Sequence, residues 1–245
     1  MCRLDVQVAR LAGLSRSAAQ ELVREGKVRV NGAAAAKPGM MIRETDRVDY
    51  SFEQPRYVSR GGRKLEAALA AFRIDLRGCV CLDVGASTGG FTDCMLQHGA
   101  RYVYALDVGT AQLHEKLRAD VRVKSLENTN VLAVTREIFH ERPSFAAMDV
   151  SFVSAAKILS GAQVLAGIGR VVVLVKPQFE CGRAKLGKRG IVRDSAAHRA
   201  AVEGVTKAGE SAGLRRRGVI ESPIRGGDGN REYLVFFEQA EEEQA

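Results

Sequence analysis

Four charged residues that lie far apart in the sequence occupy positions where a parallel sheet presents side chains to a ligand. Lys64 begins an expected helix, Asp149 ends an apolar strand, Lys176 follows another apolar run, and Glu232 begins the last expected strand. Each of them alone would ordinarily be a solvated charge. Ligands of a doubly wound sheet bind outside the carboxyl ends of its strands, so all four would meet at one crevice. Four charged groups around one crevice are much less ordinary than separate solvated charges, which indicates a functional site.

A glycine-rich turn follows the apolar segment 80–84, where a strand ends and a helix begins. Glycine and other small residues allow the backbone to approach a ligand closely. Asp107 ends the next expected strand, where a carboxylate can accept hydrogen bonds from both hydroxyls of an adenosine ribose. The candidate cofactor residues are Asp83, Gly85, Ala86, Ser87, Thr88, Gly89, Gly90 and Phe91 around the turn, then Asp107, Val108, Glu127 and Asn128 after the next two strands.

The spacing of these glycines discriminates between cofactors. A dinucleotide site requires Gly-x-Gly-x-x-Gly, whereas this turn reads Gly-x-x-x-Gly-Gly from Gly85 to Gly90. The carboxylate of Asp83 would also repel a pyrophosphate, but it would attract the ammonium group of a methionine moiety. We therefore expect S-adenosylmethionine rather than a dinucleotide. A purely structural turn is the remaining alternative, and the acid at position 107 argues against it.

The overall composition is that of an ordinary globular protein. The chain has 245 residues, of which 46% are hydrophobic, and a formal net charge of +8. No stretch approaches the ~20 apolar residues of a membrane span, and the N-terminus lacks the continuous apolar segment of a signal peptide. Five cysteines without a Cys-x-x-Cys unit and four dispersed histidines indicate reduced thiols, no metal site and a cytoplasmic location.

The positive charge is concentrated in the first quarter of the sequence. Residues 1–64 hold 13 Lys and Arg against 7 Asp and Glu, a net charge of +6, whereas the remaining 181 residues contribute only +2. A small basic segment joined to a nearly neutral body is typical of a module that binds a polyanion such as RNA. A basic surface that only aids solubility is the alternative explanation.

The chain divides into two expected domains. Residues 1–54 predict two short helices and a few short strands, residues 55–60 a linker, and residues 61–245 an α/β domain. In the second domain, apolar runs alternate with amphipathic helices, which is typical of a doubly wound and mostly parallel sheet. This pattern includes an expected helix over 112–118 and an expected strand over 121–124.

Candidate RNA contacts lie in the basic first domain and in a later loop. Between Lys176 and Arg193, six cations accompany a single glutamate among several glycines, which predicts a basic loop beside the crevice that can close over phosphates. An ordinary surface loop is the alternative. The candidate RNA-binding residues are Arg3, Ser15, Arg16, Lys27, Arg29, Asn31, Lys37, Arg60, Arg63, Lys185, Lys188 and Arg189.

These motifs together resemble known families. Residues 59–238 are similar to the FtsJ-type ribose 2′-O-methyltransferases, whose Lys-Asp-Lys-Glu tetrad matches the four charged residues described first. Residues 3–50 resemble the alpha-L RNA-binding motif of a small-subunit ribosomal protein and of pseudouridine synthases. The combination, together with the segment Lys176-Pro177-Gln178-Phe179-Glu180, resembles the TlyA family, which also carries the label of haemolysin.

The resemblance implies a Rossmann-like, S-adenosylmethionine-dependent methyltransferase fold. Its α/β sheet would be doubly wound, seven-stranded and mostly parallel, preceded by a small α+β RNA-binding domain. The implied activity is methylation of cytidine 2′-hydroxyls in 16S and 23S ribosomal RNA, with ribosomal RNA or ribosomal subunits as partners and no membrane. A non-catalytic RNA-binding ribosome-assembly factor and a membrane-lytic haemolysin are the alternatives. The oligomeric state is not indicated.

Within this resemblance, Lys176 is assigned as the base that removes the proton of the ribose hydroxyl. It must be neutral to do so, and the neighbouring Lys64, the loss of water and the positive sulfur of the cofactor all favour a neutral amine. Asp149 is expected to orient Lys176, and Glu232 is expected to hold Lys64 in position.

Overall fold

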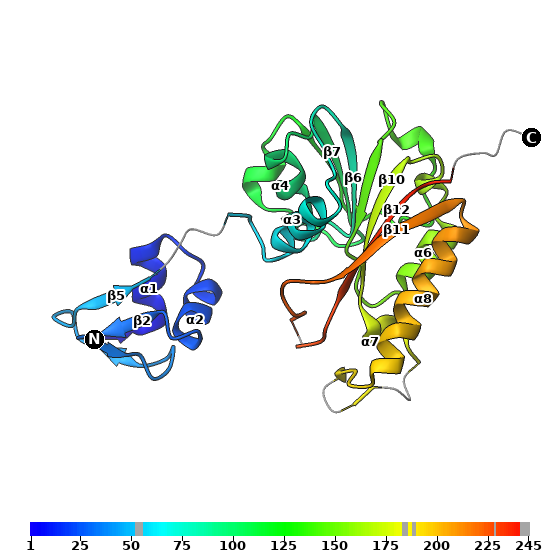
Figure 1. Cartoon of the computed structure of the whole chain (residues 1–245). Helices are drawn as coiled ribbons and strands as arrows, with labels where there is room; N and C mark the ends of the chain where they lie inside the picture. The colour runs from blue at the N-terminus through cyan, green and yellow to red at the C-terminus, as the bar shows by residue number, and fades with distance from the viewer. Residues whose placement is uncertain (52–55, 183–185, 188–189, 228, 241–245) are drawn as a thin grey trace, which may run out of the picture. The chain divides into compact units, whose positions relative to one another are not determined.

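The computed structural model describes residues 1–51, 56–182, 186–187, 190–227 and 229–240. The chain forms two compact units, Met1–Pro55 and Arg56–Ala245 (Figure 1). Residues 56–60, which we expected to belong to a linker, lie in the second unit. There Tyr57 is only 3% exposed, and the Val58 N–H donates a hydrogen bond to the Asp93 carboxylate over 2.8 Å.

The first unit packs two helices against short antiparallel strands. Its elements are β1 (Cys2–Arg3), α1 (Leu4–Ala12), α2 (Arg16–Arg24), β2 (Val28–Val30), β3 (Ala33–Ala34), β4 (Met41–Ile42) and β5 (Val48–Tyr50). Strand β2 lies between β3 and β5, and β1 pairs with β4. The small core consists of the buried side chains of Leu4, Val8, Ala19, Leu22, Val23, Val28, Val30 and Ile42. This α+β arrangement agrees with the one expected for an RNA-binding domain.

The second unit is built on a seven-stranded sheet in the order β11-β12-β10-β9-β6-β7-β8. The strands are β6 (Val80–Val84), β7 (Tyr102–Leu106), β8 (Val123–Leu126), β9 (Phe145–Met148), β10 (Arg170–Val175), β11 (Leu214–Glu221) and β12 (Tyr233–Gln239). Strands β6 to β10 run parallel, and β12 is antiparallel to both of its neighbours. The predicted doubly wound, mostly parallel α/β fold is therefore confirmed.

Helices cover both faces of this sheet (Figure 1). They are α3 (Gly61–Ala71), α4 (Gly90–Gln97), α5 (Glu115–Arg118), α6 (Ala155–Gly161), α7 (Pro177–Glu180) and α8 (Ser195–Ser211), with 3₁₀ turns at Arg136–Ile138 and Gln163–Leu165. Because side chains alternate along a strand, Cys81 joins the core formed with α3 and α4, whereas Leu82 joins the core formed with α6 and α8. Both faces are thus apolar, as a parallel sheet requires.

Two expected elements have different bounds in the structure. The helix expected over 112–118 begins only at Glu115, because the N–H groups of Gln112 and Leu113 donate to the Glu127 carboxylate instead of entering a helix. The strand expected over 121–124 is β8, which begins at Val123. The short helices α6 and α7 were not predicted.

From β6 the chain adds β7 and β8 on one side of β6, and it then crosses to β9 on the other side of β6. The order of strands reverses between β6 and β9, which are therefore the topological switch point of the sheet. Val84 and Met148 are level in the register, as are Val175 and Tyr233. The residues that follow β6, β9 and β10 therefore share one edge with those that precede β12. Open α/β sheets bind their ligands at this edge.

Candidate active site

A pocket of about 250 Å³ lies at this edge of the sheet. Three of the four predicted catalytic residues line it, one each from α3, the end of β9 and the end of β10. The glycine-rich turn forms another wall. The lining residues are Ser59, Arg60, Gly61, Lys64, Gly85, Ala86, Ser87, Gly90, Phe91, Asp149, Ser151, Lys176, Arg225 and Gly227.

Lys176 is buried and is held by two neighbours on the turn after β9. Its Nζ lies 2.6 Å from Oδ1 of Asp149, at an angle unsuited to a hydrogen bond, and donates a hydrogen bond to Oγ of Ser151 over 2.7 Å. Pro177 begins α7 directly after the lysine and fixes the direction in which the chain leaves the sheet. The expected contact between Asp149 and Lys176 is therefore present.

Lys64 and Glu232 form a second buried ion pair. The Lys64 Nζ donates to Glu232 Oε2 over 2.6 Å, and the two side chains are 11% and 2% exposed. On α3 the neighbouring Leu65 belongs to the core, which fixes the helix and aims the lysine at the sheet edge. A Cβ atom at Gly226 would lie 2.4 Å from Glu232 Oε1, so a side chain at this position would displace the carboxylate. Glu232 itself does not line the pocket but positions a residue that does.

The turn after β6 approaches β9 very closely. Gly85 has a φ of +84°, and a Cβ atom there would lie 2.5 Å from the carbonyl oxygen of Asp149. Only glycine satisfies both the conformation and the distance. The cofactor turn and the residue that contacts Lys176 are thus packed directly against each other.

Asp83 lies inside the sheet and is fully buried. Its Oδ2 accepts a hydrogen bond from the Thr92 hydroxyl over 2.6 Å, whereas Oδ1 has no hydrogen-bond partner among the described residues. Burial raises the pKa of Asp83 to about 7, and the negative charge of Asp149 acts in the same direction, while the bond from Thr92 opposes it. The buried oxygen without a partner can accept a donor from a ligand.

The raised pKa of Asp83 predicts a pH-dependent stability. Between about pH 4 and pH 7 the folded protein keeps a proton that an unfolded aspartate has lost, so the free energy of unfolding falls as the pH rises through this window. We expect Asp83→Asn to remove this part of the decrease. Urea unfolding of the native protein and of Asp83→Asn at pH 5, 6 and 7 measures the free energy of unfolding. The same dependence on pH in the two proteins would contradict the prediction.

The remaining candidate cofactor residues form the neighbouring ends of β7 and β8. Both carboxylate oxygens of Asp107 accept backbone N–H groups, from Ser87 over 2.8 Å and from Gly109 over 2.7 Å. Each oxygen retains a lone pair that a ribose hydroxyl could use. Hydrogen bonds from the backbone of Leu113 and its neighbour hold the pKa of Glu127 below its usual range. Outside the lining of the pocket lie Asp83, Thr88, Gly89, Asp107, Val108, Glu127 and Asn128.

Several residues near the site were not predicted. Ser151 and Arg225 line the pocket, and Phe152 is 93% exposed beside it with a φ of +65°. A serine or phenylalanine three or four positions after a strand is common, so the sequence contains no specific signal for these residues. Arg225 lies in the segment that joins β11 to β12.

Several candidate RNA-binding residues of the first unit take part in local hydrogen bonds. Arg3 and Arg16 both contact the buried Asp5, over 2.9 and 3.1 Å, and the bond from Arg3 holds the pKa of Asp5 well below its usual range. Both guanidinium groups stay about half exposed, at 44% and 55%. Ser15 accepts the Ala18 N–H at the start of α2, and Asn31 accepts the N–H of Arg47.

The other candidate RNA-binding residues are mostly exposed. Lys27 pairs with Glu25 over 2.7 Å, and Arg29 donates to the Gly32 carbonyl over 3.1 Å. Lys37 and Arg63 are exposed, and Arg60 lines the active-site pocket. Lys185, Lys188 and Arg189 lie outside the described residues.

Comparison with known proteins identifies the family. A model of the FtsJ-like methyltransferases matches residues 57–239, and a model of the S4 domain matches residues 2–48. The protein "16S/23S rRNA (cytidine-2'-O)-methyltransferase TlyA" of Mycobacterium tuberculosis is 41% identical over 239 residues, which cover 96% of this chain and 89% of the relative. This chain belongs to the TlyA family of FtsJ-like methyltransferases. The predicted membership is confirmed.

Other TlyA-like proteins carry a hemolysin name. "Hemolysin A" of Brachyspira hyodysenteriae is 42% identical over 225 residues, 91% of this chain and 93% of the relative. A solved structure described as a hemolysin from Streptococcus thermophilus is 45% identical, has a TM-score of 0.77, and covers 98% of this chain and 88% of its own. Within the part of the chain that the structure describes, no helix has the length and apolar character needed to cross a membrane.

The site suits S-adenosylmethionine, which is the methyl donor of FtsJ-like methyltransferases. Asp83 Oδ1 is a buried acceptor without a partner among the described residues, and the glycine-rich turn leads directly from it to the pocket. The turn from Gly85 to Phe91, with Asp83 and Asp107 on either side, would hold the cofactor. Over the described ranges of the chain, no group of three or more His, Cys, Asp or Glu side chains could hold a metal ion.

Proposed function

We propose that this protein transfers a methyl group from S-adenosylmethionine to the 2′-hydroxyl of a cytidine ribose in 16S or 23S ribosomal RNA. The observation that carries the proposal is the buried Lys176, which contacts Asp149 and Ser151 in a pocket at the switch point of a methyltransferase sheet. The printed name of the Mycobacterium tuberculosis relative supports the substrate.

The contacts of Lys176 suit a proton acceptor. A neutral amine has two N–H groups and one lone pair. Ser151 accepts one of these N–H groups, and the Asp149 carboxylate lies beside Nζ without accepting a hydrogen bond, so the lone pair is available to a ribose hydroxyl in the pocket. The proton of the hydroxyl moves to Nζ as the oxygen forms its bond to the methyl carbon. The resulting ammonium is then stabilised by Asp149, 2.6 Å away.

S-adenosylmethionine supplies an electrophilic methyl group whose sulfur leaves with the bonding electron pair. The residues of this chain align the acceptor oxygen with that methyl group, and such positioning alone can lower a barrier by ~7–11 kcal/mol. Lys64 lines the same pocket and, held by Glu232, places a fixed positive charge near the acceptor. That charge favours removal of the hydroxyl proton.

Phe152 is suited to hold the base of the target nucleotide. Its ring is 93% exposed and lies 5.4 Å from the ring of Phe179, which is itself 6.0 Å from Lys176 Nζ. A φ of +65° costs a bulky side chain about 1–3 kcal/mol, and such strain is concentrated at functional sites. An exposed aromatic ring next to the catalytic lysine provides a stacking surface for a base.

We expect Phe152→Ala to raise the KM for RNA by about 10-fold or more, since stacking of one base contributes ~1–3 kcal/mol. The affinity for S-adenosylmethionine should stay unchanged, because the turn that would hold the cofactor is untouched. Phe152→Tyr keeps the aromatic face and serves as the matched control. Steady-state methyl transfer measures the effect, and an unchanged KM in the alanine variant would contradict the stacking role.

The S4 domain would supply affinity for structured RNA through phosphate contacts. Such contacts weaken as salt increases, because counterions bound to RNA are released on binding. Arg3 and Arg16 present half-exposed guanidinium groups, and Lys37 is exposed in the same unit. Ribosomal RNA within a ribosomal subunit is the partner we propose, and the cytoplasm is where such a partner occurs.

Mapping of ribose methylation tests the proposal directly. The purified protein is incubated with S-adenosylmethionine and with free ribosomal RNA or separated ribosomal subunits, and 2′-O-methyl groups are located by sequencing. We expect one or a few cytidines to gain the group with the native protein and none with Lys176→Ala. Methyl groups on bases only, or binding of RNA and cofactor without transfer, would overturn the proposal. The latter result would favour a non-catalytic assembly factor.

A further inference from the structure

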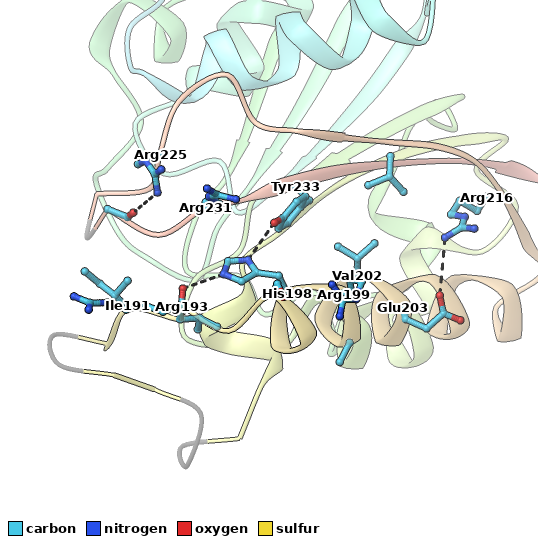
Figure 2. A pocket seen from close by; sticks show the side chains of 15 residues that line it. Ile191, Arg193, His198, Arg199, Val202, Glu203, Arg216, Arg225, Arg231 and Tyr233 are labelled. Carbon is cyan, nitrogen blue, oxygen red and sulfur yellow. Dashed lines mark hydrogen bonds and ion pairs between the residues drawn. The ribbon is translucent and has the colours of Figure 1, made fainter.

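A second and larger pocket, of about 1140 Å³, lies between α8 and the segment that joins β11 to β12. We name it the arginine groove. Figure 2 shows Arg225 and Arg231 along one side, and Arg193 and Arg199 along the other. The arginines that line the groove are Arg193, Arg199, Arg216, Arg225 and Arg231. Arg193 is the last cation of the basic loop predicted from the sequence, whereas no role was predicted from the sequence for the other four.

The positive charge of the groove is poorly compensated. Arg193 and Arg199 are exposed and have no ion-pair or hydrogen-bond partner for their side chains among the described residues. Glu203 is the only acidic residue of the described lining, and its Oε2 lies 4.0 Å from Arg216. Such long exposed contacts neutralise little charge. The groove is therefore ready to bind an anion with several negative groups.

The floor of the groove is apolar and fixed. Val202 and Tyr233 line it, and the buried His198 uses both ring nitrogens within the protein. One nitrogen lies 2.9 Å from the Val192 carbonyl and the other 3.2 Å from the Tyr233 hydroxyl (Figure 2). An apolar floor between rows of guanidinium groups suits a single nucleic-acid strand, whose bases and riboses can pack below while its phosphates contact the arginines.

The groove is continuous with the active site. Arg225 lines both pockets. Its carbonyl oxygen also accepts a hydrogen bond from Arg60, another residue of the active-site lining, over 3.2 Å. A strand whose ribose lies at Lys176 can therefore pass Arg225 and enter the groove without leaving the protein surface.

We propose that the arginine groove binds the RNA strand that flanks the methylated nucleotide, with its phosphates on Arg193 and Arg199. This inference rests on the proposed function and extends it, because it gives the catalytic unit its own site for the substrate strand. These two arginines, which have no partners among the described residues, supply the binding charge. The shared Arg225 sets the direction in which the strand leaves the active site.

The double variant Arg193→Ala/Arg199→Ala tests the groove. Its matched control is Arg142→Ala/Arg215→Ala, which removes two exposed arginines that do not line the groove. Binding of a fluorescein-labelled single-stranded RNA 20-mer is measured by anisotropy at several salt concentrations, alongside methyl transfer to ribosomal RNA. We expect the groove variant to weaken binding about 10-fold or more and to reduce the salt slope by ~1.4, or ~0.7 for each phosphate that is no longer neutralised. The KM for RNA should rise while kcat stays within about two-fold.

Equal binding and equal salt slopes in the two double variants would overturn the proposal. The proposal would also be overturned if the groove variant lost affinity for a poly-glutamate peptide but kept its affinity for the RNA. The groove would then bind an acidic protein segment. If the native protein transfers methyl groups and the groove variant has the same KM for RNA, the groove does not bind the substrate strand, and the proposed function stays intact. RNA binding through the groove without any methyl transfer would refute the function and leave the groove assignment intact.

Discussion

Lys176→Ala is expected to lower kcat for methyl transfer by at least ~10²-fold, the lower end of what a positioned general base contributes. The affinities for S-adenosylmethionine and RNA should change little, because the substitution leaves the glycine-rich turn and the basic surfaces intact. Single-turnover transfer of a labelled methyl group measures the chemical step, and equilibrium binding measures the affinities.

The matched control for this variant is Lys157→Ala, which removes an exposed lysine of α6. Lys176→Met adds a second control, since it keeps most of the buried stem and removes only the amine. We expect normal turnover in the first control and the same loss as in Lys176→Ala in the second. Turnover that persists in both Lys176 variants would exclude this lysine as the base.

Glu232→Ala is expected to lower the free energy of unfolding of the second unit by about 3–5 kcal/mol. The reason is that it leaves the Lys64 ammonium, whose side chain is 11% exposed, without its carboxylate partner. Urea unfolding followed by circular dichroism measures the change. The control is Glu221→Ala, which removes a carboxylate that is 52% exposed and 3.7 Å from Arg231, and which should cost less than ~1 kcal/mol.

A double variant separates the structural part of this effect from the chemical part. Lys64→Met/Glu232→Leu removes both charges and fills the space with apolar atoms, and it should recover most of the stability that Glu232→Ala loses. We expect methyl transfer to stay low, because the fixed charge near the acceptor is gone. Recovery of both stability and activity would show that the pair only supports the fold.

The parts of the fold that were predicted correctly carry strong apolar patterns. Strand β6 coincides with the apolar segment 80–84, and β7 ends directly before Asp107, where the next strand was expected to end. Continuous apolar runs bounded by polar turns leave little choice of register. The α5 region lacks such a pattern. There a single carboxylate, that of Glu127, captures two backbone N–H groups and displaces the helix start.

The residues of the site were also predictable only where they adjoin strong apolar patterns. The end of a parallel strand is predictable, so Asp149 and Lys176 could be placed at one edge from their positions after apolar runs. The positions of side chains in turns could not be predicted, because the path of a turn depends on tertiary contacts rather than on periodicity. Ser151 and Arg225 belong to such turns. The buried Asp5, which pairs with both Arg3 and Arg16, was not predicted, because a single acidic residue on a helix usually faces water.

The pairing of Lys64 with Glu232 links residues 168 positions apart. A ribosome that is still making this protein has to translate that whole interval before the lysine can meet its carboxylate. Until β12 inserts between β10 and β11, Lys64 lacks the carboxylate with which it pairs in the folded protein. Methylation competence therefore arises late in biogenesis, after the sheet has acquired its antiparallel strand.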